Sequence, residues 1–168
     1  MLKKNFIIYF IIISLLYFQN SYSKISIISK IDGSIITDYD IEKELGYLKV
    51  LNIQINQLKN DQLLKISLEG LINETVKIKE VEKFQKFRKI DFSKNDSIKN
   101  SVNQYLNDLI NKLDLDNIEN LKFQLALNNS YTIDELKKKI EIELLWNELI
   151  IFMFKNQINI NEDKIIDR

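Results

Sequence analysis

The 168-residue sequence contains no cysteine and no histidine, and these two absences exclude several classes of site. Without cysteine the chain has no disulfide framework, no thiolate site and no lipid-modified cysteine. Without histidine it lacks the usual general base, the commonest zinc ligand and every Ser-His or Cys-His catalytic pair. We therefore expect a protein that is not an enzyme and that has no catalytic residue, metal or cofactor.

Glycine is scarce, and neither sign of charge is in excess. The three glycines, Gly33, Gly46 and Gly70, lie too far apart to form a glycine-rich phosphate-binding loop. Lys plus Arg and Asp plus Glu each number 24, so the overall charge does not attract nucleic acid. These features argue against an ATP-driven machine and against a nucleic-acid partner.

Residues 1–23 have the three-part layout of a secretory signal peptide. Lys3 and Lys4 precede an apolar run over residues 6–18, and a polar stretch follows it. This run of 13 residues is shorter than the roughly 20 that a membrane-spanning helix needs. We expect cleavage, and the alternative is an uncleaved leader that anchors the protein in the membrane.

The expected cleavage site lies before Lys24, because Ser21 and Ser23 place small side chains at the two positions that a signal peptidase reads. Lys3 and Lys4 keep the N-terminus in the cytoplasm, so the rest of the chain faces the outside of the inner membrane in either case. This arrangement predicts an exported protein of the periplasm, with residues 24–168 as one domain.

The mature chain begins with a predicted β-hairpin that leads into a helix. Residues 25–37 contain two β-branched runs around Asp32-Gly33, a dipeptide typical of a type I′ turn. Thr37 stands where a hydroxyl caps a helix that begins at Asp38.

Apolar periodicity then predicts a bundle of about five helices, so the fold class is mainly α. In the second helix we expect a broad core face of Leu64, Leu68, Leu71, Ile72 and Val76, with Gly70 as a weak point. A turn at residues 128–130 precedes the last helix, and this helix begins with a capping box of Thr132 and Glu135. A brief strand at 157–160 and the start of another helix at 161–163 follow. The five helices cover approximately residues 38–51, 61–87, 98–113, 118–127 and 132–154.

Three passages of this chain resemble the N-terminal domain of SurA-type periplasmic chaperones. KIDGSIITDYDIEKEL, residues 30–45, is similar to the hairpin and capped helix that open the domain, and LINETVKIKEVEKF, residues 71–84, is similar to its second helix. Residues 120–150 together with ININEDKI, residues 158–165, are similar to its later helices. One departure is Asn128-Asn129-Ser130, where relatives often have a glycine.

The resemblance implies an ATP-independent chaperone that binds unfolded outer-membrane proteins or other exported polypeptides. It would bind segments of these clients that are extended and rich in aromatic residues. Relatives usually continue into parvulin-type prolyl isomerase domains, and no isomerase site can be carried over to this chain. One alternative is a structural or interaction subunit with one fixed partner. Another is a truncated member of a peptidyl-prolyl isomerase family.

The candidate client-binding residues are Trp146, Phe152, Met153 and Phe154, because methionine and large aromatic side chains adapt to varied apolar partners. The last helix is apolar on almost every side, so we expect it to be central or paired and these residues to lie mainly in the core. A homodimer would compete for the same surface.

Two charged features have simpler explanations than a functional site. The lysine-rich stretch of residues 77–89 is interrupted by Glu80 and Glu82 and predicts a solvated helix face. The carboxylate pairs Asp38 with Asp40 and Asp114 with Asp116 lie at predicted helix boundaries, where capping explains them.

Overall fold

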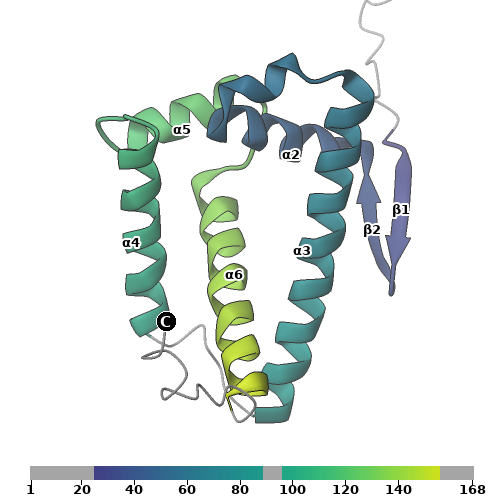
Figure 1. Cartoon of the computed structure of the whole chain (residues 1–168), viewed down its shortest axis with the longest axis vertical. Coiled ribbons are helices and arrows are strands. Elements are labelled where there is room, and N and C mark those ends of the chain that lie inside the picture. Colours follow the sequence, from purple (N-terminus) through teal and green to yellow (C-terminus); the bar gives the residue numbers. More distant parts are fainter. Residues whose placement is uncertain (1–24, 89–95, 156–168) are drawn as a thin grey trace, which may run out of the picture.

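The computed structural model describes residues 25–88 and 96–155 as a β-hairpin, five α-helices and a short 3-10 helix (Figure 1). The mainly helical class with an N-terminal hairpin is confirmed. The leader, the strand expected at 157–160 and the helix start expected at 161–163 lie outside the described residues. The elements are β1 (Ile27–Ile31), β2 (Ser34–Thr37), α2 (Asp38–Leu51), η1 (Ile53–Gln57), α3 (Asn60–Arg88), α4 (Asp96–Lys112), α5 (Ile118–Leu127) and α6 (Ile133–Phe154).

The hairpin and the first helix form as their local sequence predicts. Asp32 and Gly33 have φ values of 45° and 83°, and a type I′ turn requires positive φ at both central residues. β1 pairs antiparallel with β2, with an irregularity in register between Ile27 and Ser29. The Thr37 hydroxyl accepts a hydrogen bond from the backbone N–H of Asp40, whose carboxylate accepts one from the N–H of Thr37, so the helix begins with a capping box.

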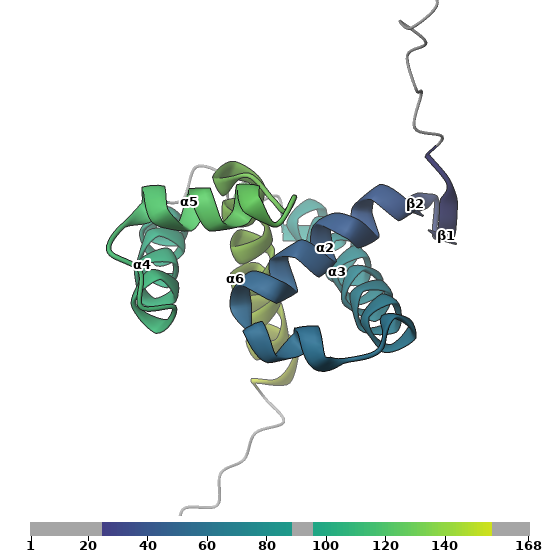
Figure 2. The same cartoon turned by 90° about the horizontal axis from the view of Figure 1, so that it is seen from above.

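The helices surround α6, which is central as expected. Figure 1 shows α3 and α6 running in the same direction and ending at the lower end of the molecule, while α2 and α5 cross the upper end. Seen from above, α6 lies between α3 and α4 (Figure 2). The main core joins α4, α5 and α6 with part of α3, and its most deeply buried large side chains are Leu121, Leu125, Leu136 and Val81.

The core face of α3 is only partly the one predicted, since Leu71 is buried as expected and Leu68 and Ile72 pack half-buried beside it. Leu64 and Val76 are exposed, whereas Leu63 is buried. The sequence places apolar side chains at both 63 and 64, so periodicity alone does not select the buried stripe. Packing against α2 and α6 selects it, and the buried positions of α3 are Leu63, Ser67, Leu71 and Val81.

The turn between α5 and α6 packs directly on α2. Asn129 has a φ of 51°, in the left-handed region that asparagine tolerates, so the turn expected at residues 128–130 is confirmed. The Ser130 hydroxyl donates a hydrogen bond to the backbone carbonyl of Lys43, with 3.2 Å between the oxygens. Thr132 and Glu135 form the predicted capping box at the start of α6. Because the turn before this box is bonded to α2, α2 fixes the position at which α6 begins.

Candidate functional site

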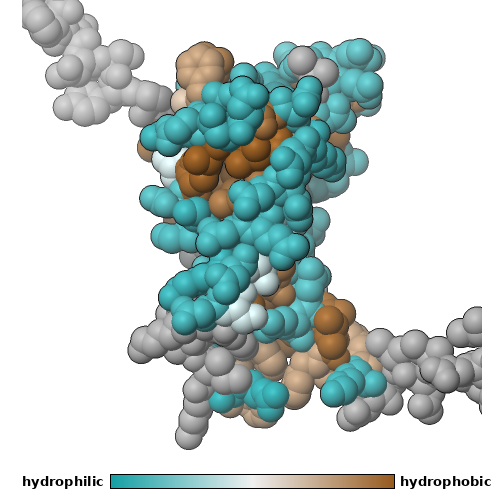
Figure 3. All heavy atoms as spheres, turned by 90° about the vertical axis from the view of Figure 1, so that its left-hand side faces the viewer, coloured by the Kyte–Doolittle hydropathy of each residue, from teal (hydrophilic) through white to brown (hydrophobic). Residues whose placement is uncertain are grey.

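An apolar pocket of about 340 Å³ opens where α3 and α6 end together. Phe84 and Phe87 line it from α3, and side chains from Trp146 onward line it from α6. On the face seen in Figure 3, apolar side chains gather in the upper half and again at this lower end, with hydrophilic ones between. We call this cavity the terminal pocket, and its lining residues are Glu80, Lys83, Phe84, Phe87, Trp146, Leu149, Ile150, Phe152, Met153 and Phe154.

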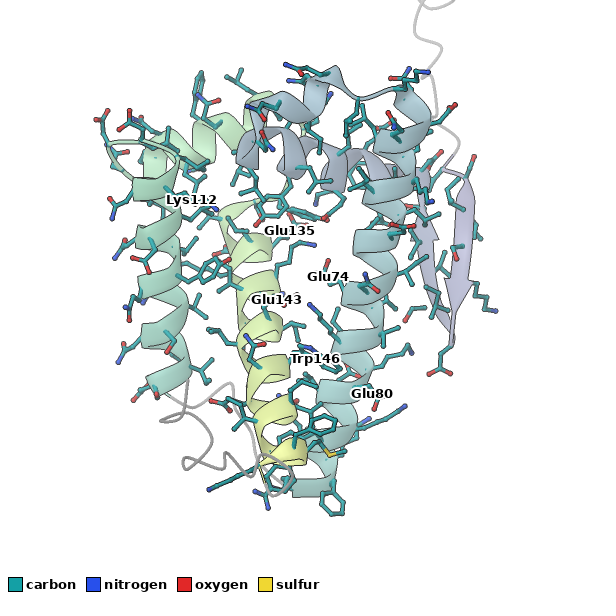
Figure 4. The ribbon with its side chains drawn as sticks, viewed as in Figure 1. Glu74, Glu80, Lys112, Glu135, Glu143 and Trp146 are labelled. Atoms are coloured by element: carbon teal, nitrogen blue, oxygen red, sulfur yellow. The ribbon has the colours of Figure 1, made fainter. Side chains whose placement is uncertain are left out.

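The structure brings all four candidate client-binding residues into the terminal pocket. Trp146 lies between α6 and α3 (Figure 4), where it is partly buried against the main core. Phe152, Met153 and Phe154 remain 43%, 59% and 43% exposed. The expectation of core burial is therefore wrong for these three side chains, which follow Leu149, the last buried position of α6.

The wall of the terminal pocket on α3 was missed by the sequence analysis. Phe84 packs against Phe152 with 5.2 Å between ring centroids, and Phe87 is 79% exposed. The available signal was the pair of phenylalanines three residues apart in the last turns of the helix, where i and i+3 share a face. Their contact with α6 needs tertiary structure to be seen.

Charged side chains border the apolar lining of the terminal pocket. Lys83 pairs with Glu80 one turn earlier on α3, with 2.7 Å between nitrogen and oxygen. The Arg88 guanidinium lies 4.2 Å from the centroid of the Phe152 ring and 5.9 Å from that of Phe84, within cation–π range of both. The pocket therefore combines aromatic walls with a cationic rim.

A buried ionic network holds α2, α3 and α6 together above this pocket. Glu44 of α2 is only 5% exposed, and its carboxylate accepts a 2.6 Å hydrogen bond from the Tyr131 hydroxyl. The Lys139 ammonium of α6 lies 2.9 Å from the same carboxylate and also contacts Glu74 of α3. Burial raises the pKa of Tyr131 far above its ordinary value, and the neighbouring Glu44 raises it further, so the phenol stays protonated and donates.

Gly70 has a specific place in this network. A Cβ atom on Gly70 would lie 3.2 Å from Oε1 of Glu44, so the glycine gives room for the buried carboxylate. The predicted weak point of α3 is thus the position at which the α2 carboxylate approaches the helix closely.

The lysine-rich stretch of α3 is only partly the solvated face that we expected. Lys77 pairs with Glu143 of α6 at 2.6 Å, and Figure 4 shows Glu143 and Glu74 between the two helices. The Lys79 ammonium donates to the backbone carbonyl of Asp32 at 2.6 Å, which ties the hairpin turn to α3. These lysines therefore hold elements together, while Lys83 pairs with Glu80 within the helix.

The carboxylate pairs lie at element boundaries as predicted. The Asp38 carboxylate accepts the backbone N–H of Ser26, and Asp40 closes the capping box. Asp114 has a φ of 54° in the turn after α4, and Asp116 accepts a hydrogen bond from the Asn120 amide. Within residues 25–88 and 96–155, acidic side chains form no group of three or more that could hold a metal ion.

Comparisons with protein-family models, with curated proteins and with solved structures each found no match for the chain. The similarity to SurA-type chaperones therefore stays a prediction from the sequence. No helix in the described part of the chain is long and apolar enough to cross a membrane.

Proposed function

We propose that this chain is an exported, ATP-independent chaperone-like protein that binds unfolded segments of outer-membrane proteins in the terminal pocket. One observation carries the proposal, which is the gathering of exposed Phe87, Phe152, Met153 and Phe154 around one cavity at the joint end of two helices. Clustered exposed apolar side chains of this kind mark interaction surfaces, whereas isolated ones are ordinary.

The composition of the terminal pocket suits varied unfolded segments better than one rigid ligand. Phe87 and Met153 are largely exposed, and the flexible thioether of Met153 adjusts to different apolar shapes. A volume of about 340 Å³ lies at the lower end of the range for ligand pockets, so the space suits a side chain better than a large ligand.

The expected affinity also fits a chaperone that works without nucleotide. Full burial of one phenylalanine side chain contributes roughly 1.5–3 kcal/mol, which alone gives a dissociation constant in the millimolar range or weaker. Such a segment leaves by simple dissociation, so its release needs no energy source. A long client with several aromatic segments offers several such sites, so it can hold several copies of the protein at once.

The cellular setting and the client class rest on the sequence. The leader-like residues 1–23 support export, and the resemblance of residues 30–45, 71–84 and 120–150 supports a chaperone of outer-membrane proteins. The absence of histidine and cysteine from the sequence supports a role in binding instead of catalysis.

Aggregation of an unfolded outer-membrane β-barrel protein, diluted from denaturant and followed by light scattering, tests the proposal. We expect protein purified after expression of the full chain to suppress scattering without nucleotide when it is in molar excess over the client. Phe152→Ser combined with Phe87→Ser should lose most of this effect. Phe123→Ser should keep it, because Phe123 is 59% exposed on α5 and does not line the terminal pocket.

Failure to suppress scattering at any ratio would contradict the chaperone function. In that case a pull-down from periplasm that yields one partner at fixed stoichiometry would favour the interaction-subunit alternative. Equal losses in the Phe123 variant and the pocket variant would show that general surface hydrophobicity, not the terminal pocket, holds the client.

A further inference from the structure

We infer that two copies of this chain associate through the ends of α3 and α6, with Phe87 of each copy in the terminal pocket of the other. This contact goes beyond client binding. Only its consequence, that a client binds by displacing the second copy, rests on the proposed function. The shape of this end, its exposed apolar area and its charges support the contact.

The surface at this end has both a protruding aromatic side chain and a cavity that can hold one. Phe87, in the last turn of α3, is 79% exposed, more than any other large apolar side chain of residues 25–88 and 96–155. It also lines the terminal pocket of about 340 Å³, so the side chain stands at the mouth of the cavity. In a two-fold dimer the same patch faces itself, so the side chain that protrudes from each copy meets the cavity of the other. A protruding side chain beside a cavity therefore makes this surface complementary to itself.

The exposed apolar area is enough for a weak dimer. Besides Phe87, the side chains of Phe152, Met153 and Phe154 are 43%, 59% and 43% exposed. With roughly 200 Å² for a whole side chain of this size, these four leave about 450 Å² in water in each copy. Two copies can thus bury about 900 Å² from these side chains, and Ile151 in the same turn is exposed as well. A specific interface needs about 1,000 Å² in total, so we expect a dissociation constant in the micromolar range.

The charges at the ends of α3 and α6 allow two copies to meet. Lys83 and Glu80 pair with each other. The other charged residues in the last two turns of the two helices and directly after α6 are Lys86, Arg88, Lys155, Glu82 and Glu148. Each helix C-terminus adds roughly half a negative charge, so the described groups come close to neutrality. Two such ends do not repel each other, and they lack the excess of one sign that would favour an acidic or a basic partner.

Sedimentation velocity on protein purified after expression of the full chain tests the dimer. Between about 1 and 500 µM the average mass should rise from one chain towards two. Phe87→Ser should weaken the association at least about hundredfold, because each dimer loses two buried phenylalanines. Phe123→Ser is the matched control on α5 and should associate as the unmodified protein does, because Phe123 is exposed but does not line the pocket. Thermal unfolding by circular dichroism checks that each variant is folded.

Spin labels show which end of the molecule forms the contact. The chain has no cysteine, so a nitroxide attaches only where one is introduced. A label on Lys86→Cys should give a dipolar distance between copies, because residue 86 stands beside Phe87. A label on Phe123→Cys should give none, because α5 lies at the opposite end of the molecule (Figure 1) and α6 alone is roughly 33 Å long.

A client-like peptide tests the consequence for the proposed function. The probe is a nonapeptide with blocked ends and one central phenylalanine. At about 5 mM, near the affinity expected for one buried aromatic side chain, it should shift the sedimenting species towards the single chain. The same peptide with serine in place of phenylalanine should leave the dimer unchanged.

The possible outcomes separate this inference from the proposed function. A single chain at every concentration would overturn the dimer and leave the chaperone proposal standing. A dimer that Phe87→Ser does not weaken, or that gives no distance at residue 86, would also overturn the inference, because another surface would then hold the copies together. A dimer with the expected distance in a protein that fails to suppress scattering would support the inference and count against the chaperone function. A dimer that persists with the phenylalanine peptide bound would contradict competition for one pocket.

Discussion

Replacement of Gly46 by alanine should destabilise the protein, although alanine is the better helix former. Gly46 is buried in α2 and faces the turn between α5 and α6. An added Cβ would lie 2.1 Å from the backbone carbonyl oxygen of Asn128 and 3.2 Å from the Cβ of Ser130. Ordinary contact begins near 3.4 Å, so the turn would have to move by about 1.3 Å.

The expected size of this effect follows from three contributions. Overpacking against well-packed atoms costs roughly 1–3 kcal/mol, and the upper end applies because the obstacle is backbone. The shift also stretches the hydrogen bond from Ser130 to Lys43, a contribution of about 1 kcal/mol. Higher helix propensity returns about 1 kcal/mol. We expect a net loss of about 3 kcal/mol in the free energy of unfolding.

Urea unfolding followed by circular dichroism and by Trp146 fluorescence measures this loss. With a denaturant slope of about 2 kcal/mol per molar, the midpoint should fall by about 1.5 M. Gly70→Ala is the matched control, because its Cβ would meet only the end of the Glu44 side chain, and its stability should change by less than about 1 kcal/mol. Equal midpoints for Gly46→Ala and the unmodified protein would refute the close approach of α2 to this turn.

Three further predictions concern the core, the ionic network and the start of α6. Leu136→Ala should lower the free energy of unfolding by about 2–5 kcal/mol in urea titrations, because Leu136 is fully buried, and a loss below about 1 kcal/mol would contradict this. Tyr131→Phe should cost about 1.5 kcal/mol in the same assay, because buried Glu44 loses a donor, and an unchanged midpoint would remove the tyrosine from the network. The Lys43 ammonium and the helix cap hold the pKa of Glu135 at about 2, below its ordinary 4.5. The stability that this carboxylate contributes should therefore be present above pH 4.5 and be lost as the pH falls towards 2. Glu135→Gln should show a weaker loss over that range in melting temperature, and identical pH profiles would contradict the pairing.

The local elements were predictable because their signals lie within a few residues of one another. The Asp32-Gly33 turn and the Thr37 cap act over at most three residues, so sequence spacing fixes their geometry. The same holds for Thr132 and Glu135 at the start of α6. The predicted helix boundaries follow these caps closely. The buried stripe of α3 could not be predicted in the same way, because it depends on which helices pack against α3.

The ionic network could not be predicted because the sequence allows too many pairings of acidic and basic residues. Glu44 and Tyr131 are 87 residues apart, and Lys139 has to be chosen from 24 basic residues facing 24 acidic ones. Only the packing of α2 and of α6 against α3 makes this pairing unique. Gly70 was a weak indication of this network, since a glycine inside a helix indicates that another group approaches the helix closely. The sequence does not show which group this is.

The terminal pocket shows where an apolar pattern stops being informative. Along α6 the buried positions Leu136, Ile140, Leu145 and Leu149 follow the helical period and then stop, although the apolar sequence continues to Phe154. A run that is apolar on every side predicts burial only where neighbouring helices extend as far. α3 ends beside α6 at Arg88, and among the described residues these two helices alone line the pocket at this end. The aromatic side chains beyond that point add little to the described core, so their replacement should affect client binding more than the free energy of unfolding.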